Sequence, residues 1–309
     1  MFSSNNIFYF TPYNPQKYIY LMYKFRIIPL IFLFLFALQA NAKTYSFNEA
    51  IAEYTKRELV QPKPENDGRI QTLNRKGAAS PGFDEATTEF IKFAKNKKVL
   101  EIGGAYGQVM LETLGKYKDT IYHLNDLHAD HLFIAAHNLK TSQVKIVTQN
   151  IEFIEGDIAQ GLHVANKYDA ILIARVLHFF NPEQLDKTLN NIKFMLKPGG
   201  RVYVIAITPY TKRYEKFIPE YEKRLASNEE FPGYVQSLYD WLNKDVTSKD
   251  QIVKISDEPF MFLDDVVLRR LFKKHGYKVI TCKTRPLSYK SASWSLDGRE
   301  NVVLIAEKK

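Results

Sequence analysis

The sequence predicts an α/β protein: a doubly wound, mostly parallel seven-stranded sheet whose last strand is antiparallel. Three observations support this fold class. Short apolar runs alternate with amphipathic stretches, a glycine-rich turn at residues 103–107 follows the first run, and the last two runs are joined by a segment without helical periodicity. Alternating strands and helices form a mostly parallel sheet covered by helices on both faces. A connection without a helix favours an antiparallel pair.

Each predicted strand is a short apolar run bounded by polar residues, glycine or proline. Runs of four to eight residues with such boundaries are typical of buried strands. In chain order the seven runs are Val99–Ile102, Thr120–Asn125, Asn150–Ile154, Tyr168–Ala174, Arg201–Ile207, Tyr277–Cys282 and Asn301–Ala306.

The clearest helix prediction lies between the fourth and fifth strands. Asn181 is a typical N-cap, Pro182 fits the first helical position, and Gln184 completes a capping box. The sequence Pro-Gly-Gly at 198–200 ends the helix. Its apolar side chains fall on one stripe: Leu185, Leu189, Ile192 and Leu196.

Two segments do not follow the alternation. Residues 43–95 precede the first strand and predict two helices, around Ser46–Leu59 and Asp84–Lys95, that flank a polar loop. Within the main domain at 96–309, residues 209–262 separate the fifth strand from a helix predicted at Leu263–Lys274. This insertion is too aromatic for a disordered linker, so we expect a helical cap over the strand ends.

Residues 1–42 have the pattern of a signal peptide. Lys24 and Arg26 precede an apolar stretch from Ile27 to Leu38, and Ala-Asn-Ala at 40–42 is a small-x-small cleavage site. The stretch is shorter than the ~20 residues that span a bilayer. The sequence therefore predicts export to the periplasm or the medium, with no stable membrane span in the mature chain. An uncleaved N-terminal anchor and an N-terminal helix packed on the domain are the alternatives.

Charge and cysteine content narrow the function classes. The chain has 309 residues and a formal net charge of +9. Three of these charges belong to the leader, which leaves +6 on a remainder without a long basic run. We therefore expect no nucleic-acid partner. The single cysteine, Cys282, excludes an intrachain disulfide and a two-cysteine metal clip.

The glycine-rich turn and two later acids predict a ligand site. In a doubly wound sheet, ligands bind beyond the carboxyl ends of the strands, and glycine lets a ligand approach the main chain. Asp126 ends the second strand, about 20 residues beyond the turn, where a carboxylate can accept hydrogen bonds from two ribose hydroxyls. Asp157 is a second acid at a strand end. A tight turn without a ligand and two surface acids are the alternative reading.

These residues resemble the class I S-adenosylmethionine-dependent methyltransferases. "VLEIGGAYG" at 99–107 is similar to their first motif, "NDL" at 125–127 to their ribose acid, and "EGDI" at 155–158 to their adenine-contacting acid. The stretch 168–206, with "LKPGG" between its helix and the next strand, is similar to their fourth and fifth strands. The resemblance covers residues 97–208 well and 263–309 more loosely.

The resemblance implies S-adenosylmethionine as the cofactor. It implies that Glu101 and the turn, with Gly103, Gly104, Ala105 and Gly107, hold the methionine part. Ala105 stands where the family usually has glycine, which puts the fit of the cofactor in question.

The resemblance also implies roles at the later strand ends. Asp126 takes the ribose hydroxyls, Leu127 packs on the adenine, Asp157 accepts from the adenine amino group, and the Ile158 amide meets a ring nitrogen. The segment from Arg175 to His178 borders the sulfonium and the substrate.

His178 is the predicted general base. It follows the fourth strand, and an imidazole ordinarily titrates near neutral pH; a packing role is the alternative. His128 and His131, three residues apart beside two acids, raise a metal site as a further alternative, but the ribose turn already accounts for that stretch, so we predict no metal.

The leading function prediction is methyl transfer to a small molecule, whose identity the sequence leaves open, as it does the oligomeric state. "ARVLHFFNP" lacks the Asn/Asp-Pro-Pro-aromatic motif of the adenine- and glutamine-modifying members. The alternative is an exported, catalytically retired binding or adaptor protein on the same fold, because S-adenosylmethionine is made in the cytoplasm. A nicotinamide dehydrogenase needs a third glycine where Gln108 stands.

Overall fold

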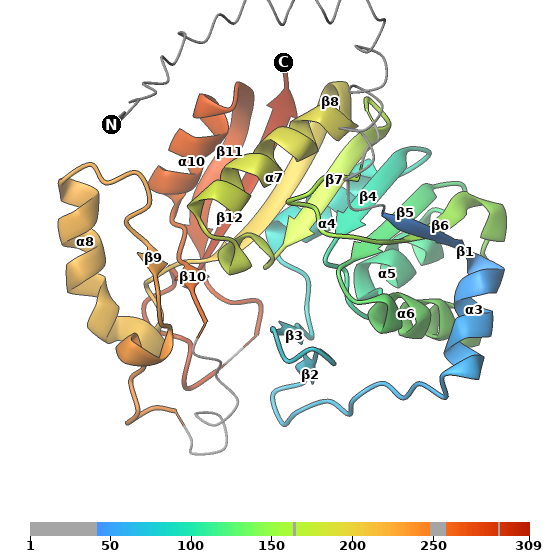
Figure 1. The fold of residues 1–309 in the computed structure, drawn as a ribbon, viewed down its shortest axis with the longest axis horizontal. Helices are drawn as coiled ribbons and strands as arrows, with labels where there is room; N and C mark the ends of the chain where they lie inside the picture. The colour runs from blue at the N-terminus through green and yellow to red at the C-terminus, as the bar shows by residue number, and fades with distance from the viewer. Residues whose placement is uncertain (1–41, 163–164, 248–257, 290) are drawn as a thin grey trace, which may run out of the picture. The chain divides into compact units, whose positions relative to one another are not determined.

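The computed structural model describes residues 42–162, 165–247, 258–289 and 291–309, and the predicted leader lies outside this part except for its last residue. The described chain is built around an eight-stranded sheet with the order β1-β6-β5-β4-β7-β8-β12-β11 (Figure 1). The strands are β1 (Lys43–Ser46), β4 (Lys98–Ile102), β5 (Ile121–Asp126), β6 (Ile151–Glu155), β7 (Tyr168–Ala174), β8 (Leu196–Ile207), β11 (Tyr277–Arg285) and β12 (Asn301–Lys308).

The sheet confirms the predicted fold class. Strands β6, β5, β4, β7 and β8 run parallel, and β12 is antiparallel to both β8 and β11. The sheet has one strand more than predicted, because β1 pairs antiparallel with β6 at the edge. The sequence Lys-Thr-Tyr-Ser of β1 buries only Tyr45, so it carries no apolar run that could have announced a strand.

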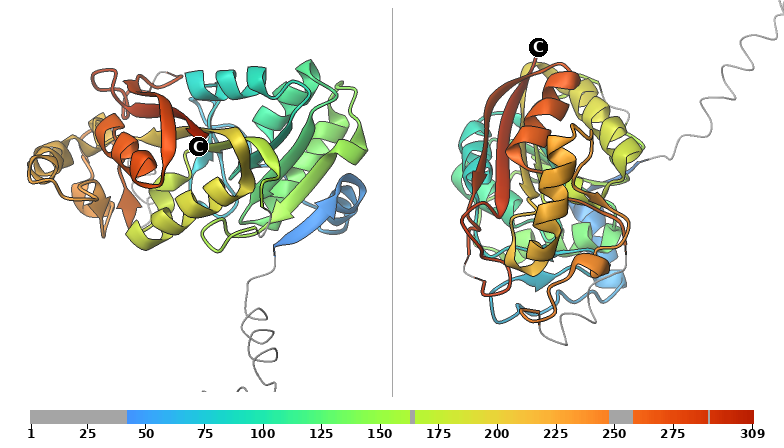
Figure 2. Two further views of the ribbon diagram at one scale, coloured as in Figure 1. Left: turned by 90° about the horizontal axis from the view of Figure 1, so that it is seen from above. Right: turned by 90° about the vertical axis from the view of Figure 1, so that its left-hand side faces the viewer.

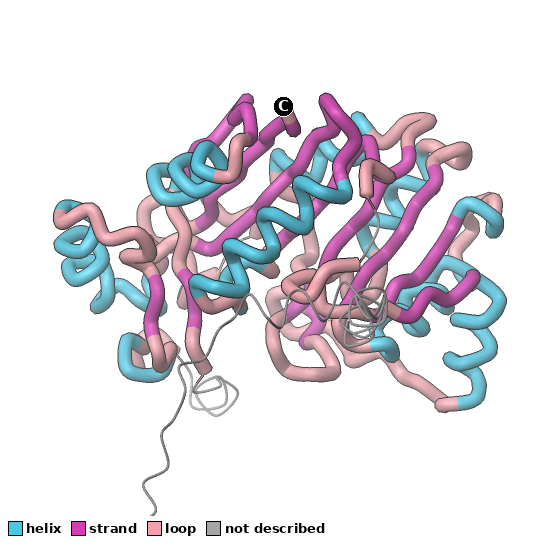
Figure 3. The backbone as a smooth tube through the Cα atoms, turned by 45° about the horizontal axis from the view of Figure 1, so that its top comes forward, coloured by secondary structure: helices cyan, strands magenta, loops and turns pink. Residues whose placement is uncertain are grey.

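Helices cover both faces of the sheet, as Figures 2 and 3 show. Alternate strand residues point to opposite faces: Val99 packs in the layer under α3–α6, and Leu100 in the layer under α7 and α10. One layer holds α3 (Phe47–Lys56), α4 (Glu85–Phe93), α5 (Gln108–Lys116) and α6 (Ala129–Thr141), and the other holds α7 (Pro182–Met195) and α10 (Asp265–Lys274).

The predicted capping box of α7 is confirmed. Asn181 Oδ1 accepts from the Gln184 amide at 2.9 Å, and Gln184 Oε1 accepts from the Asn181 amide at 3.1 Å. The helix ends at Met195, and the chain enters β8 at the next residue. The capping residues therefore fix where α7 starts, just beyond the loop that follows β7.

The described residues of the insertion at 209–262 contain the predicted helices together with a strand pair that the sequence did not predict. It contains a 3-10 helix η4 (Lys212–Phe217), α8 (Ile218–Ala226) and η5 (Tyr239–Trp241), but also β9 (Tyr234–Val235) paired with β10 (Phe260–Met261). Its aromatic residues pack on each other in a core of their own. This core includes Tyr210, Tyr214, Phe217, Tyr221, Phe260 and Phe262.

The polar loop between α3 and α4 also contains a small hairpin, β2 (Ile70–Gln71) and β3 (Ala78–Ala79), which the sequence did not predict. The Tyr106 hydroxyl donates to the Gln71 carbonyl at 2.8 Å, so the hairpin is held against the start of α5. Within the described residues no helix combines the length and apolar character needed to cross a membrane.

Candidate functional site

A cavity of about 310 Å³ opens at the carboxyl ends of the parallel strands. The turn between β2 and β3 forms part of the cavity wall, with Thr72, Lys76 and Gly77. Nine residues that the sequence assigned to the cofactor line this one cavity: Glu101, Gly103, Gly104, Ala105, Asp126, Leu127, Asp157, Ile158 and Arg175.

The glycines after β4 are required by the packing of the protein itself. A Cβ at Gly103 would lie 2.3 Å from Val176 Cγ2, and a Cβ at Gly104 would lie 2.2 Å from Leu124 Cδ1. Gly103 also has a φ of +67°, which favours glycine. The sequence argument attributed these glycines to an approaching ligand, and the structure shows that neighbouring side chains, Val176 after β7 and Leu124 of β5, already require them.

Gly107 is not among the residues that line the cavity, so its predicted contact with the cofactor stays a prediction. It precedes α5 with a φ of +74°, and a Cβ there would lie 2.9 Å from Ala135 Cβ on α6. Its lack of a side chain serves the turn and the close approach of α5 to α6.

Ala105 adopts a left-handed backbone conformation with a φ of +44°. An L-residue there costs about 1–2 kcal/mol, whereas glycine adopts it without a steric penalty. The departure from the family's glycine is therefore accommodated by local strain.

Replacing Ala105 with glycine should stabilise the chain. Because the relief of strain exceeds the extra unfolded-state entropy of glycine, we expect Ala105→Gly to raise the free energy of unfolding by about 0.5–1 kcal/mol. Urea unfolding of both proteins measures the difference. A variant less stable than the parent would show that the methyl group makes a packing contact worth more than the strain.

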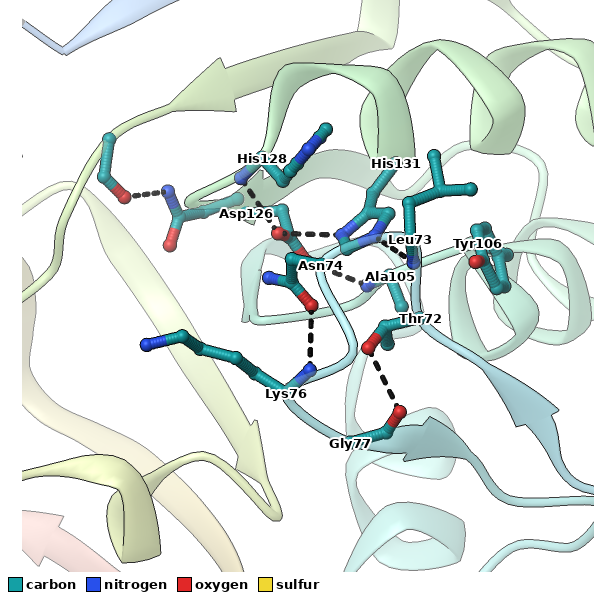
Figure 4. A network of polar contacts seen from close by, with 12 residues as sticks. Thr72, Leu73, Asn74, Lys76, Gly77, Ala105, Tyr106, Asp126, His128 and His131 are labelled. Carbon is teal, nitrogen blue, oxygen red and sulfur yellow. Dashed lines mark hydrogen bonds and ion pairs between the residues drawn. The ribbon is translucent and has the colours of Figure 1, made fainter. Parts of the chain in front are cut away.

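Asp126 is the hub of a polar network beside the turn (Figure 4). Its Oδ2 accepts from the Ala105 amide at 3.0 Å, and its Oδ1 accepts from the His128 amide and from His131 Nδ1, each at 3.0 Å. A carboxylate offers about four lone-pair sites. The three internal bonds leave one acceptor site, on Oδ2, so this conformation can take one ribose hydroxyl and not the two that the sequence suggested.

His131 joins this network to the hairpin. Its Nε2 lies 3.0 Å from the Leu73 amide, which can only donate, so Nε2 is the acceptor and Nδ1 carries the proton that is given to Asp126 (Figure 4). His131 is therefore neutral here. It connects the turn of the hairpin to Asp126 at the end of β5. The described residues contain no group of three or more histidine, cysteine, aspartate or glutamate side chains arranged to hold a metal ion.

Glu101 is buried beneath the turn. It is 4% exposed, and the Tyr122 hydroxyl donates to its Oε2 at 2.7 Å. Burial raises the pKa of Glu101 to about 8; the Tyr122 hydrogen bond opposes the shift, and the charge of Asp126 adds to it. The carboxyl is thus mostly protonated at neutral pH.

The side chains after β5 and β6 suit a flat heterocycle. Leu127 is 62% exposed although it is apolar, and Ile158, which lines the same cavity, is buried. Asp157 Oδ1 accepts from the Ala159 amide at 2.8 Å. The other oxygen of Asp157 has no hydrogen bond to the described residues and is available to an amino group.

Arg175 ends the cavity on the β7 side. It has a φ of +57°, and its Nη2 donates to Asp84 Oδ2 at 2.6 Å. Asp84 is 4% exposed, so the pair is largely shielded from water. Sequence reasoning placed Arg175 near the substrate but could not find Asp84, because 91 residues separate the two partners.

His178 does not line the cofactor cavity, and its predicted titration near neutral pH is wrong. It lines a second cavity, is 3% exposed, and stacks on Phe260 at 4.7 Å. Burial, aided by the charge of Arg175, lowers the pKa of His178 to about 3. The imidazole is neutral and a weak base, so its assignment as the general base stays a prediction.

Comparison with known proteins agrees with this geometry. Residues 99–200 match the family model described as a methyltransferase domain. O-methyltransferase 4 of Dictyostelium discoideum is 27% identical over 132 residues, 43% of this chain and 36% of that protein. The highly reducing polyketide synthase aurA of Calcarisporium arbuscula is 31% identical over 114 residues, 36% of this chain and 4% of the synthase. The chain thus spans about a third or less of these relatives.

A solved structure shows the fold directly. A methyltransferase from Methanosarcina mazei, described as S-adenosylmethionine-dependent, superposes with a TM-score of 0.52 over 71% of this chain and 96% of that chain, at 14% identity. The residues that match the family model, 99–200, include β5, β6, β7 and nearly all of β4. The carboxyl ends of these strands border the cavity. Residues 99–200 therefore match a methyltransferase domain, and the described chain has the fold of an S-adenosylmethionine-dependent methyltransferase of known structure.

Proposed function

We propose that this protein transfers the methyl group of S-adenosylmethionine to a small molecule. One observation carries the proposal: three acids from three successive strand ends, Glu101, Asp126 and Asp157, face a single cavity beside the glycine-rich turn. This set matches the polar groups of the cofactor, which are an ammonium, ribose hydroxyls and an adenine amino group. The exposed Leu127 and the buried Ile158 supply apolar surface for the adenine ring.

Each residue has a role that follows from its contacts. Asp126 would accept from a ribose hydroxyl through Oδ2, and Asp157 from the adenine amino group. Glu101, deprotonated by a neighbouring cation, would pair with the methionine ammonium. When bound, the cofactor supplies an electrophilic methyl group on a sulfonium. The chain's own contribution is then to position an acceptor in line and to exclude water.

Calorimetry tests the proposal. Purified protein should bind S-adenosylmethionine and its demethylated product saturably, and it should release the product in the presence of a suitable acceptor. Gly104→Leu, which forces a side chain into Leu124 and Glu101, should bind neither. Absence of both binding heat and thermal stabilisation in the wild-type protein would refute the proposal. Binding without turnover on any acceptor would instead favour a retired enzyme.

We also propose that the protein is exported. The basic, apolar and small-residue sections of residues 22–42 support this location. Mass spectrometry of the mature chain from the extracellular or periplasmic fraction should give an N-terminus at Lys43. A chain that keeps its leader and sediments with membranes would favour the anchored alternative.

A further inference from the structure

A second cavity of about 200 Å³ adjoins the cofactor cavity. Three segments far apart in sequence meet around it: the hairpin region from Glu65 to Ser80, the insertion, and the loop between β11 and β12. Residues that line both cavities form the boundary between them: Lys76, Gly77, Ala78, Ser80, Arg175 and Phe179. A molecule in the second cavity would therefore face the cofactor across Arg175 and Phe179.

Aromatic rings form much of the second cavity's wall. Tyr214 and Phe260 come from the insertion, Phe179 from the turn after β7, and Tyr289 and Trp294 from the loop between β11 and β12. Flat side chains suit a flat ligand, because stacked or edge-on rings bury much surface at defined separations. The volume lies below the range usual for drug-sized ligands, so it favours a ligand with a single ring.

Cations outnumber anions among the side chains of the wall. Five of the lining side chains are arginine or lysine, against two glutamates. His178 is neutral because of its burial and adds no charge. A cavity lined by one sign of charge with apolar walls concentrates the opposite charge. The five cations are Arg69, Arg75, Lys76, Arg175 and Arg213.

Ion pairs hold Arg69, Lys76 and Arg175 in the wall. Arg69 Nε lies 2.8 Å from Asp67 Oδ2, Lys76 Nζ lies 3.1 Å from a Glu258 oxygen, and Arg175 is paired with Asp84. These pairs fix side chains in the wall and reduce its net charge.

Arg75 and Arg213 are two further cations of this wall. Arg75 forms no ion pair with any residue that the structure describes, and a positive φ of +57° holds it in the tight turn of the hairpin. Arg213 is 5% exposed, donates to Ser293 Oγ at 2.9 Å, and lies 4.6 Å from the centre of the Trp294 ring. A planar guanidinium beside an aromatic ring matches a carboxylate carried on a ring.

We propose that the second cavity binds the methyl acceptor and that this acceptor is a small aromatic carboxylate. Its carboxylate lies toward Arg75 and Arg213, its ring lies against Trp294 and Tyr214, and its methyl-accepting end lies at the boundary with the cofactor cavity. This inference rests on the proposed function for the identity of its neighbour, but the binding of an aromatic anion can be measured independently.

Tryptophan fluorescence provides the test. The chain has two tryptophans, Trp241 and Trp294, so in a Trp241→Phe background Trp294 reports on the cavity alone. Titration with 4-hydroxybenzoate in the presence of saturating S-adenosylhomocysteine should give saturable quenching. Its uncharged analogue 4-hydroxybenzamide and the non-aromatic cyclohexanecarboxylate should each bind at least tenfold more weakly, because one lacks the charge and the other the ring.

Two variants that each remove one positive charge distinguish a specific contact with Arg75 from a general effect of the protein's positive charge. Arg75→Gln should weaken 4-hydroxybenzoate binding about tenfold and abolish the preference over the amide. Arg201→Gln removes the same charge near the start of β8, at the opposite end of the strand from the cavity, and should bind as the parent does. Equal binding of acid and amide, equal effects of the two variants, or competition between 4-hydroxybenzoate and S-adenosylhomocysteine would overturn the proposal.

The same titrations keep this proposal distinct from the proposed function. Calorimetry measures S-adenosylhomocysteine binding separately. If 4-hydroxybenzoate binds and S-adenosylhomocysteine does not, the carboxylate site stands as an anion site and the methyl-transfer function fails. If S-adenosylhomocysteine binds and no aromatic carboxylate does, the acceptor assignment alone is refuted.

Discussion

Replacing Asp126 with asparagine should reduce the affinity for S-adenosylmethionine by one to two orders of magnitude and destabilise the fold. Three N–H donors point at this carboxylate, from Ala105, His128 and His131. An asparagine presents one amino group to them, so one buried donor loses its partner, at a cost of about 1–3 kcal/mol. If Asp126 binds the ribose as proposed, the variant also removes a charge-assisted hydrogen bond to it, worth about 1.5–3 kcal/mol.

Asp130 provides a matched control. It lies in the first turn of α6, and its Oδ1 accepts from Arg57 at 2.7 Å near the surface. Because an exposed ion pair contributes at most about 1 kcal/mol, Asp130→Asn should bind the cofactor like the wild-type protein. Calorimetry and thermal unfolding of both variants give the comparison. If Asp126→Asn binds within twofold of the wild-type protein, the assignment of Asp126 to the ribose is wrong.

The central sheet could be predicted from the sequence because its strands are buried on both faces. Each such strand is a continuous apolar run with polar ends, and the bounds of Tyr168–Ala174 were predicted without error. The edge strand β1 and the hairpin β2–β3 could not be predicted. They are short, contribute few buried side chains, and depend on partners more than 50 residues away: β6 for β1 and His131 for the hairpin.

The site was predictable to the extent that it follows from strand ends. Carboxyl ends of parallel strands meet at one edge, so Glu101, Asp126 and Asp157 were bound to converge once the topology was known. How deeply a side chain at a strand end is buried could not be predicted from the strand positions. The sequence places His178 at a strand end, but the neutral, weakly basic state of its ring comes from its burial, in part against Phe260, and from the charge of Arg175.

The pH dependence of stability should expose the buried carboxyl of Glu101. Its pKa is about 8 in the folded chain, against an ordinary value of 4.5. Between these values the folded state holds one proton more than the unfolded state, so the free energy of unfolding falls as pH rises. The slope for one group is at most about 1.4 kcal/mol per pH unit. This contribution is fully present below pH 4.5 and is lost as pH rises through about 8.

Glu101→Gln isolates this contribution. Glutamine keeps the shape of the protonated acid and can still accept from the Tyr122 hydroxyl, but it does not titrate. The free energy of unfolding of the variant, relative to that of the wild-type protein, should therefore rise by about 2 kcal/mol between pH 6 and pH 8 and reach a plateau at higher pH. Denaturant unfolding at several pH values measures the difference, in which the other titrating groups cancel. A difference that does not change with pH would show that Glu101 is already ionised in the folded chain.

The same carboxyl predicts that cofactor binding releases a proton. A cation held beside Glu101 favours its ionised form, so at pH 7 the wild-type protein should release up to one proton per S-adenosylmethionine, and the affinity should rise with pH up to about 8. Calorimetry in two buffers with different ionisation enthalpies counts the protons. Glu101→Gln should release none and should bind more weakly at pH 8 than the wild-type protein. Equal proton counts for the two proteins would place the ammonium of the cofactor away from Glu101, and the methionine part would then be held by the turn alone.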